Sequence, residues 1–347
     1  MLEFSKKKFK IMLVGDPHEN DRLKSDRDKA ARADFLRFQY AAIDREKPDL
    51  VVLMGDNVGA DTFDGFQKAL TEITQPYVDS CTPLALIYGN HELEHKFCDK
   101  NKIDEAYKNI PGSIYLSGDY TNGSDYCVPI YSNGKPSFCL YFINSGSNCE
   151  NQALSRYDYV HDEQISWYEK ISAEFTKNNG GVPVPSIIIQ HIPVPEEYKF
   201  CKRVSKIRRK LDGVQGETLN GEFTYALDRK TGVTGYMGEA PCSPDFNNSQ
   251  FASWKKMGDV IAAFFGHDHM NDFVGTLDGI MLGQVKTASF RAYGDGLRQG
   301  VRIVELLDGY DKIYNTYMLR YRDIFGTKCD SIKGTELIPD RVTRIFD

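Results

Sequence analysis

The sequence lacks apolar segments long enough to cross a membrane, and it contains little cysteine. Its longest apolar runs, such as Leu50–Met54, have the length of a strand, whereas a membrane-spanning helix needs roughly 20 apolar residues. Eight cysteines in 347 residues are too few for a disulfide scaffold, and no two are spaced Cys-x-x-Cys. We therefore expect reduced thiols, no membrane span and no zinc site built from cysteine.

A signal peptide is also missing from the sequence. The basic residues 1–10 lead into an apolar run that stops at Asp16, whereas a signal peptide has a longer apolar core and a small-residue cleavage site. The run also leads directly into a candidate catalytic motif. These features predict a cytoplasmic protein, or a secreted one if a leader has been removed from its start.

Neither basic nor acidic residues dominate the composition. The chain has 43 Lys and Arg against 49 Asp and Glu, a formal net charge of −6, with 41% hydrophobic and 27% charged residues. This is ordinary globular usage, so disordered, collagen-like and coiled-coil proteins are excluded. The negative net charge argues against nucleic acid as a partner, because such proteins generally present a basic surface.

Short apolar, β-branched runs alternate with helical patterns in much of the chain. This alternation predicts an α/β protein whose sheets are covered on both faces. Two polar stretches, at about 98–136 and 196–250, interrupt it, and we expect them to be insertions in a single domain spanning residues 1–347. The predicted strands are Phe9–Val14, Leu50–Met54, Leu84–Tyr88, Phe138–Ile143, Ile187–Gln190, Val260–Phe265, Ile280–Val285 and Val301–Leu307, and the predicted helices are Arg32–Glu46, Phe63–Val78 and Glu163–Phe175.

Five of the predicted strands end at residues that can bind metal ions. In open α/β folds, sites form beyond the carboxyl ends of the strands. Each motif alone is a weak signal, but five of the seven histidines of the chain fall at these ends. The motifs are Asp16-Pro17-His18, Gly55-Asp56-Asn57, Gly89-Asn90-His91-Glu92, His191 and Gly266-His267-Asp268-His269.

Imidazole, carboxylate and amide groups together are typical ligands of transition metals. Seven such side chains are too many for one ion and suit two ions that share a bridging carboxylate. Two ions roughly 3.5–4 Å apart can generate hydroxide at neutral pH and stabilise the attacking and leaving oxygens of a phosphoryl group. The set of motifs therefore predicts hydrolysis of a phosphoric ester.

The ordered series of motifs resembles the calcineurin-like metallophosphoesterase superfamily, over residues 10 to about 305. The segments His191–Glu196, Gly266–Asn271 and Ala292–Gly294 resemble its purple-acid-phosphatase-like branch. The resemblance implies a four-layer α/β/β/α sandwich of two mixed β-sheets flanked by helices. It also implies Asp16, His18 and His269 on one metal ion, Asn90, His191 and His267 on a second, and Asp56 bridging the two.

The resemblance assigns His91 as the acid that protonates or stabilises the leaving oxygen. Glu92 or Asp61 would orient this histidine. In one respect the chain departs from true purple acid phosphatases, because Gly59 stands where they have a tyrosine ligand. A ferric–tyrosinate centre is therefore not expected, and Mn, Fe and Zn, as divalent or trivalent ions, all stay open.

We predict a dinuclear metal-dependent phosphoesterase in which a metal-bridging hydroxide attacks phosphorus in line. A phosphomonoester, on a small molecule or a phosphoprotein, is the favoured substrate. A phosphodiester, such as a cyclic nucleotide, a nucleic-acid end or a lipid head group, is the alternative. A non-catalytic binding scaffold would be expected to have lost ligands, and none is missing here. The sequence leaves the oligomeric state open.

Two further features have two interpretations each. The basic run Lys199–Lys210 would either draw an anionic substrate toward the site or form a solvated surface. Arg291 and Tyr293, next to Gly294, would either line the pocket and bind phosphate or be ordinary turn residues.

Overall fold

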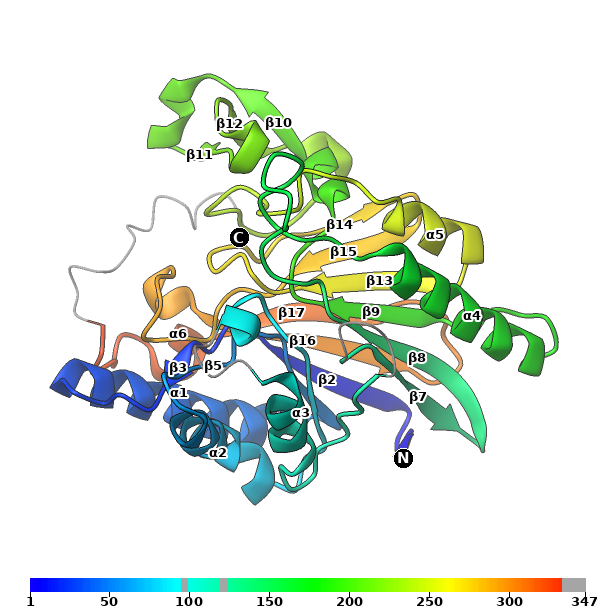
Figure 1. Ribbon diagram of the computed structural model, residues 1–347, viewed down its shortest axis with the longest axis horizontal. Helices are drawn as coiled ribbons and strands as arrows, with labels where there is room; N and C mark the ends of the chain where they lie inside the picture. Colours follow the sequence, from blue (N-terminus) through cyan, green and yellow to red (C-terminus); the bar gives the residue numbers. More distant parts are fainter. Residues whose placement is uncertain (95–98, 119–123, 333–347) are drawn as a thin grey trace.

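Two large β-sheets form the centre of the computed structural model, which describes residues 1–94, 99–118 and 124–332 (Figure 1). The first has seven strands in the order β1 (Leu2–Glu3), β7 (Tyr126–Ser132), β8 (Lys135–Ile143), β9 (Ser186–Gln190), β13 (Val260–Phe265), β15 (Ile280–Gln284) and β14 (Val274–Leu277). The second has five strands in the order β17 (Asn315–Arg320), β16 (Gly300–Leu307), β2 (Lys8–Val14), β4 (Leu50–Leu53) and β6 (Leu84–Leu86).

Both sheets are mixed, and each contains a run of parallel strands. The seven-stranded sheet contains four neighbouring parallel strands, β8, β9, β13 and β15. It also has two antiparallel pairs, β7 with β8 and β14 with β15. The five-stranded sheet contains three parallel strands, β2, β4 and β6. Strand β16 pairs antiparallel with β2 on one side and with β17 on the other. The carboxyl ends of the parallel strands of one sheet therefore meet at one edge, where loops can present side chains together.

Alternating side chains of the seven-stranded sheet separate two hydrophobic cores. In β8, Phe138, Leu140 and Phe142 belong to a core shared with the five-stranded sheet and its helices. Their neighbours Cys139, Tyr141 and Ile143 pack in a second core with aromatic residues of α4 (Asp162–Asn178) and α5 (Gln250–Met257). Successive strand residues point to opposite faces, so the two sheets pack against each other and have helices outside. The predicted α/β/β/α sandwich is confirmed.

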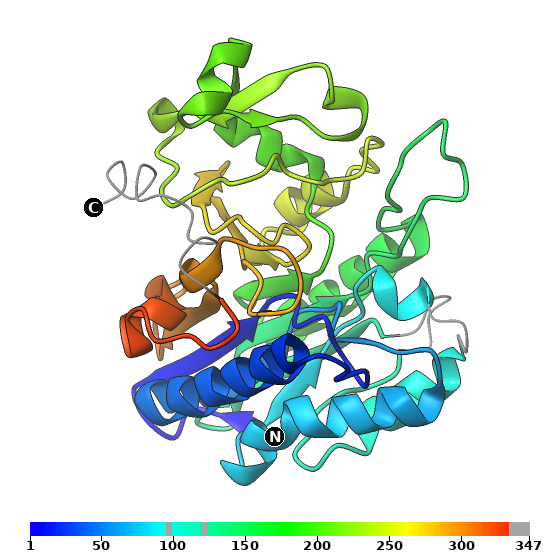
Figure 2. The same ribbon diagram turned by 90° about the vertical axis from the view of Figure 1, so that its left-hand side faces the viewer.

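The helices flank the sheets on opposite sides (Figures 1 and 2). Helices α1 (Asp26–Glu46), α2 (Phe63–Asp79) and α3 (Lys100–Lys108) lie beside the five-stranded sheet. Helix α1 begins at a capping box of Ser25 and Asp28, and it ends at Lys47, which has a left-handed φ of 48°. These caps satisfy amide and carbonyl groups that have no partner within the helix. Within the described residues, no helix has both the length and the apolar character needed to span a membrane.

All eight predicted strands and all three predicted helices are present, with ends that differ by a few residues. The first of the two expected insertions, at about 98–136, contains regular secondary structure. Its described residues contain α3, whose amino end is capped by the Asp99 carboxylate, and strand β7. Residue 98 and residues 119–123 of this insertion lie outside the described residues.

The second insertion folds into a small sheet of its own. Its strands are β10 (Cys201–Val204), β12 (Thr224–Leu227) and β11 (Val214–Gln215), in that order. Four short 3-10 turns accompany them: η2 (Pro195–Phe200), η3 (Lys206–Lys210), η4 (Thr218–Asn220) and η5 (Arg229–Thr231). This small sheet stands at the top of both ribbon views, away from the helices of the five-stranded sheet.

Candidate metal centre

The predicted ligands come from both large sheets. Strands β2, β4 and β6 of the five-stranded sheet lead into the loops that carry Asp16 and His18, Asp56, and Asn90. Strands β9 and β13 of the seven-stranded sheet lead into His191 and into His267 and His269. Because the strand ends of the two packed sheets lie side by side, five loops contribute to one site.

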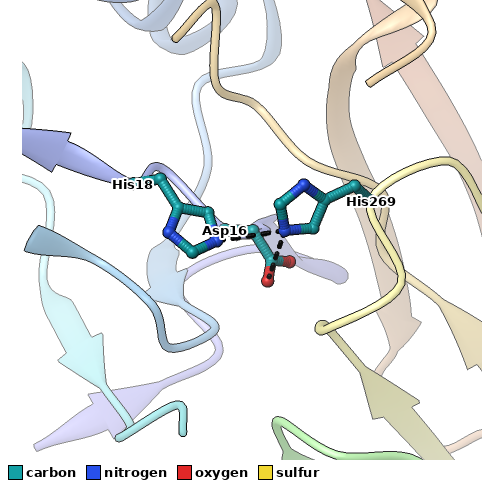
Figure 3. Close-up of side chains that lie close together, drawn as sticks. All are labelled: Asp16, His18 and His269. Atoms are coloured by element: carbon teal, nitrogen blue, oxygen red, sulfur yellow. Dashed lines mark hydrogen bonds and ion pairs between the residues drawn. The ribbon is translucent and has the colours of Figure 1, made fainter. Parts of the chain in front are cut away.

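The first group of candidate ligands is Asp16, His18 and His269, whose side chains point toward one another (Figure 3). The Nε2 atoms of His18 and His269 lie 3.0 Å apart. The Nε2 atom of His269 is 3.7 Å from Asp16 Oδ1. One ligand atom from each residue lies within 4.8 Å of the others, so a single ion could contact all three.

The second group is Asp56, His191 and His267, and all three residues are buried. His191 Nε2 lies 3.2 Å from Asp56 Oδ2 and 3.2 Å from Asn90 Oδ1. The same Oδ2 atom of Asp56 is 3.5 Å from His18 Nε2 in the first group. Asp56 therefore stands between the two groups, where one carboxylate oxygen can face two ions.

Four residues of these loops have a strained backbone. Asp16, His18, Asp56 and His267 all have φ values in the left-handed region, between 43° and 70°. Non-glycine residues rarely adopt this conformation, and such strain is typical of functional sites. Beside them, Gly55 has a φ of 93°, and a Cβ there would lie 2.5 Å from the amide nitrogen of Gly89. Glycine at this position lets the β4 and β6 loops approach closely.

Most of the histidines favour the neutral form that binds metal. Burial lowers the pKa of His18 to about 4 and that of His269 to about 3, and it holds the pKa of His267 well below its usual range. Burial also disfavours charge on His191, but the carboxylates of Asp56 and Asp16 outweigh it and raise the pKa to about 10. Neutral imidazoles and ionised carboxylates are the states in which these groups act as ligands.

Hydrogen bonds to the other ring nitrogen orient two of the imidazoles. His191 Nδ1 lies 2.8 Å from the Met54 carbonyl oxygen, and His269 Nδ1 lies 2.8 Å from that of Tyr293. Each contact turns Nε2 toward the site, as is usual for histidine ligands of metals. His267 Nε2 is buried and has no hydrogen-bond partner among the described residues. A buried polar atom without a partner destabilises the fold, and a metal ion bound at Nε2 would supply the missing partner. The donor set therefore fits two transition-metal ions.

His91 lies at the rim of the site, and its side chain is 52% exposed. Its Nε2 atom is 3.9 Å from Asp56 Oδ2, and its Nδ1 atom is 2.6 Å from Glu94 Oε2. Neither carboxylate expected to orient this ring does so: Glu92 is turned inward, and Asp61 pairs with Arg22 at 2.8 Å. The sequence did contain a signal for Glu94. On the 3-10 turn η1 (His91–Glu94), side chains three residues apart are aligned.

Glu92 has a different role, which the sequence did not indicate. Its buried carboxylate accepts hydrogen bonds from the amide groups of Asp56 (2.9 Å), Asn57 (2.6 Å) and Gly89 (2.7 Å). Three amides from the loops after β4 and β6 therefore converge on one side chain. Glu92 thereby holds together the loops that carry Asp56 and Asn90.

The two predicted substrate-binding residues lie in different surroundings. The Arg291 guanidinium is 3.6 Å from Glu19, 3.4 Å from Asp28 and 3.3 Å from the Arg22 carbonyl oxygen. Contact with a phosphate would require these interactions to be exchanged. The ring of Tyr293, in contrast, stacks on His269, with the ring centres 4.0 Å apart.

A second tyrosine, which the sequence analysis did not single out, borders the site. The ring of Tyr157 packs edge-on against the ring of His267, with the ring centres 4.5 Å apart. It belongs to the irregular segment between β8 and α4, where no residue pattern identified it. Tyr157 and Tyr293 thus each pack against one candidate histidine ligand.

Comparisons with known proteins identify the family to which the chain is similar. The family model described as calcineurin-like phosphoesterase matches residues 9–271. The chain is 28% identical to "Probable inactive purple acid phosphatase 14" of Arabidopsis thaliana, covering 86% of this chain and 75% of that protein. It is 25% identical to "Phosphatase DCR2" of Saccharomyces cerevisiae, covering 77% of this chain and 45% of that protein. A dimetal phosphatase structure from Danio rerio has a TM-score of 0.49 and 13% identity, covering 90% of this chain and 99% of that one.

Proposed function

Because the chain belongs to the calcineurin-like phosphoesterase family, we propose that it is a dinuclear metallophosphoesterase that favours phosphomonoesters. One observation carries the proposal. Two groups of three metal-binding side chains lie side by side, and Asp56 Oδ2 is within 3.5 Å of histidine nitrogens of both. The resemblance to purple acid phosphatase-like proteins favours the monoester over the diester.

In this proposal, Asp16, His18 and His269 would hold one ion, and Asn90, His191 and His267 would hold the other. Asp56 lies between the two groups and would serve both. When bound, the two ions would lower the pKa of a water molecule and neutralise the oxygens of the phosphoryl group. Imidazole, carboxylate and amide ligands leave Mn, Fe and Zn open, and Gly59 provides no tyrosinate ligand.

The protein side chains supply positioning and proton transfer. Glu94 Oε2 lies 2.6 Å from Nδ1 of His91 and orients the ring. When His91 carries a proton on each ring nitrogen, Nδ1–H donates to Glu94 and Nε2–H is the proton available to the leaving group. From this position His91 would protonate the leaving alcohol oxygen as a general acid. The amide of Asn148 in turn donates to Glu94 Oε1 at 3.1 Å, so the His91–Glu94 pair is itself held in place.

The name of the Arabidopsis relative includes the word inactive, so a binding scaffold that does not catalyse hydrolysis needs a direct test. In this chain all seven ligand candidates are present, and His91 has both a carboxylate partner and solvent access. A scaffold has no need for this proton-transfer pair. The pair therefore favours catalysis.

The test compares an aryl phosphomonoester with the corresponding bis-aryl diester. The protein is first stripped with a chelator and then reloaded with Mn, Zn or Fe. We expect monoesterase activity that Asp56→Asn reduces by at least 100-fold and that Asp44→Asn, at an exposed site on α1, leaves unchanged. Preference for the diester would overturn the substrate class. No activity on either compound, with two ions bound, would overturn catalysis in favour of a scaffold.

A further inference from the structure

The small sheet formed by residues 201–231, which we call the cap, carries a dense group of positive charges. Between Lys202 and Leu211 the sequence contains six Lys and Arg residues and no acidic residue, although the whole chain has a net charge of −6. These residues lie on β10 and η3, at the top of both ribbon views (Figures 1 and 2). The positive charge is therefore local and is presented at one end of the molecule.

Most of this charge is not neutralised by the protein. Lys202 pairs with Asp228 at 3.1 Å, and Arg208 pairs with Asp212. The other four basic side chains make no ion pair with any residue that the structure describes. These are Arg203, Lys206, Arg209 and Lys210, and all four are exposed.

Large apolar side chains stand beside these charges and are open to solvent. Ile207 is 77% exposed and Leu211 is 69% exposed, and they flank the basic residues of η3. Leu219, in the same cap, is 72% exposed. Among the described residues, only Met1 is a more exposed large hydrophobic side chain, and Val182 follows at 61%. Removing exposed leucine and isoleucine side chains from water is favourable, so a partner that covers them would gain binding free energy.

The cap holds these side chains in a defined arrangement. The Arg203 guanidinium lies over the Phe223 ring, 3.4 Å from its centre, and Arg209 Nε donates to Thr224 Oγ1 at 3.0 Å. After η3, the amide groups of Leu211 and Gly213 both donate to the Arg208 carbonyl oxygen. Because β12 and the η3 turn are joined in this way, the basic and apolar groups are presented together.

We propose that the η3 surface of the cap, formed by Arg203, Lys206, Ile207, Lys210 and Leu211, docks on an anionic lipid surface. Lysine and arginine are attracted to anionic head groups, and adjacent apolar side chains can enter the boundary with the acyl chains. Electrostatic attraction of a small phosphorylated substrate would not require exposed Ile207 and Leu211. A nucleic acid would be expected to meet open aromatic rings or base-reading side chains beside the charges. Here the exposed apolar side chains are the aliphatic Ile207 and Leu211, and the Phe223 ring is covered by the Arg203 guanidinium.

The proposal is tested by sedimentation of the full chain with vesicles. Vesicles of phosphatidylcholine alone are compared with vesicles containing 30% phosphatidylserine, at low and at physiological salt. We expect binding to the second type only, weakened by salt. Lys206→Ser with Lys210→Ser should weaken it about 25-fold, since each charge contributes roughly fivefold. Ile207→Ser with Leu211→Ser should weaken it at least fivefold and leave the salt dependence unchanged.

The matched control removes two exposed lysines from helix α4, as Lys170→Ser with Lys177→Ser. If this control loses as much binding as the cap variants, or if the intact protein does not distinguish the two vesicle types, the proposal is wrong. A 20-residue single-stranded oligonucleotide is tested at the same salt. If the protein binds the oligonucleotide more tightly than the vesicles, and the Ile207 and Leu211 changes do not affect this binding, the ligand of the η3 surface is nucleic acid and the lipid proposal is wrong. These readouts do not depend on phosphatase activity.

Discussion

His91 and Glu94 form a hydrogen-bonded pair on a single 3-10 turn, with Nδ1 of the histidine 2.6 Å from Oε2 of the glutamate. The turn also contains Glu92, whose side chain points the other way and binds backbone amides. One short segment thus orients a candidate general acid toward solvent and anchors the loops beneath it. The partner of His91 is local in sequence, whereas the ligands around it come from distant segments.

Glu94→Gln tests whether this pair transfers a proton. We expect kcat on an alkyl phosphomonoester, whose leaving group needs protonation, to fall by roughly tenfold or more, because His91 loses the carboxylate that orients its ring. An aryl ester with a good leaving group should be affected much less. Steady-state kinetics on both substrates measure the difference, with Glu174→Gln on the exposed face of α4 as control. Equal losses on the two substrates would remove Glu94 from this role.

His267→Ala tests the second ion site. The buried Nε2 of His267 has no partner among the described residues, so its removal should release one ion without breaking a hydrogen bond of that atom. We expect about one metal ion per chain by elemental analysis, against two for the unchanged protein. His161→Ala, at the amino end of α4, should keep both ions. Two ions in the His267 variant would contradict the ligand assignment.

Glu92→Gln tests the anchoring of the loops after β4 and β6. Two of the three amide hydrogen bonds reach Oε2 of Glu92 and one reaches Oε1, so a side-chain NH₂ group would have to face at least one donor. We expect the free energy of unfolding to fall by about 1–3 kcal/mol. Urea denaturation measures it, with exposed Glu3→Gln as control. A change no larger than that of the control would show that the amides find other partners.

Glu197→Gln tests a pH dependence of stability located away from the metal centre. Burial raises the pKa of Glu197 to about 8 from 4.5. One of its oxygens accepts from Gln284 Nε2 at 2.6 Å, and the other has no partner among the described residues. Because the folded pKa is the higher one, the stabilisation from the protonated carboxyl is complete below about pH 4.5 and is lost as the pH rises through about 8.

The glutamine variant stays neutral, so its stability relative to the unchanged protein should increase between pH 5 and pH 9, by roughly 4 kcal/mol at the upper end. Urea denaturation at pH 5, 7 and 9 measures this difference. Glu150→Gln, at an exposed site, should show no such trend. Parallel pH profiles for the Glu197 variant and the unchanged protein would refute the expected role of this carboxyl group.

The principal strands and helices, and the residues at the strand ends, could be predicted from local sequence patterns. Buried strands such as Leu50–Leu53 are continuous apolar runs, and helices such as Phe63–Asp79 have apolar residues at helical spacing, so local patterns suffice. The polar residues after Val14, Leu53 and Phe265 stand out because a strand ends there. Helix α3 was missed, because in nine residues only Ile103, Ala106 and Tyr107 form its buried apolar side.

How these strand ends lie relative to one another could not be predicted from such patterns. The position of Asp56 between His18 and His191 depends on the packing of two sheets, to which no single segment points. The choice of Glu94 over Glu92 depends on which side chain the turn directs inward. The exposure of Ile207 and Leu211 likewise depends on what the rest of the chain leaves uncovered. Such relationships arise from contacts between distant segments, whereas sequence patterns report the periodicity of one segment at a time.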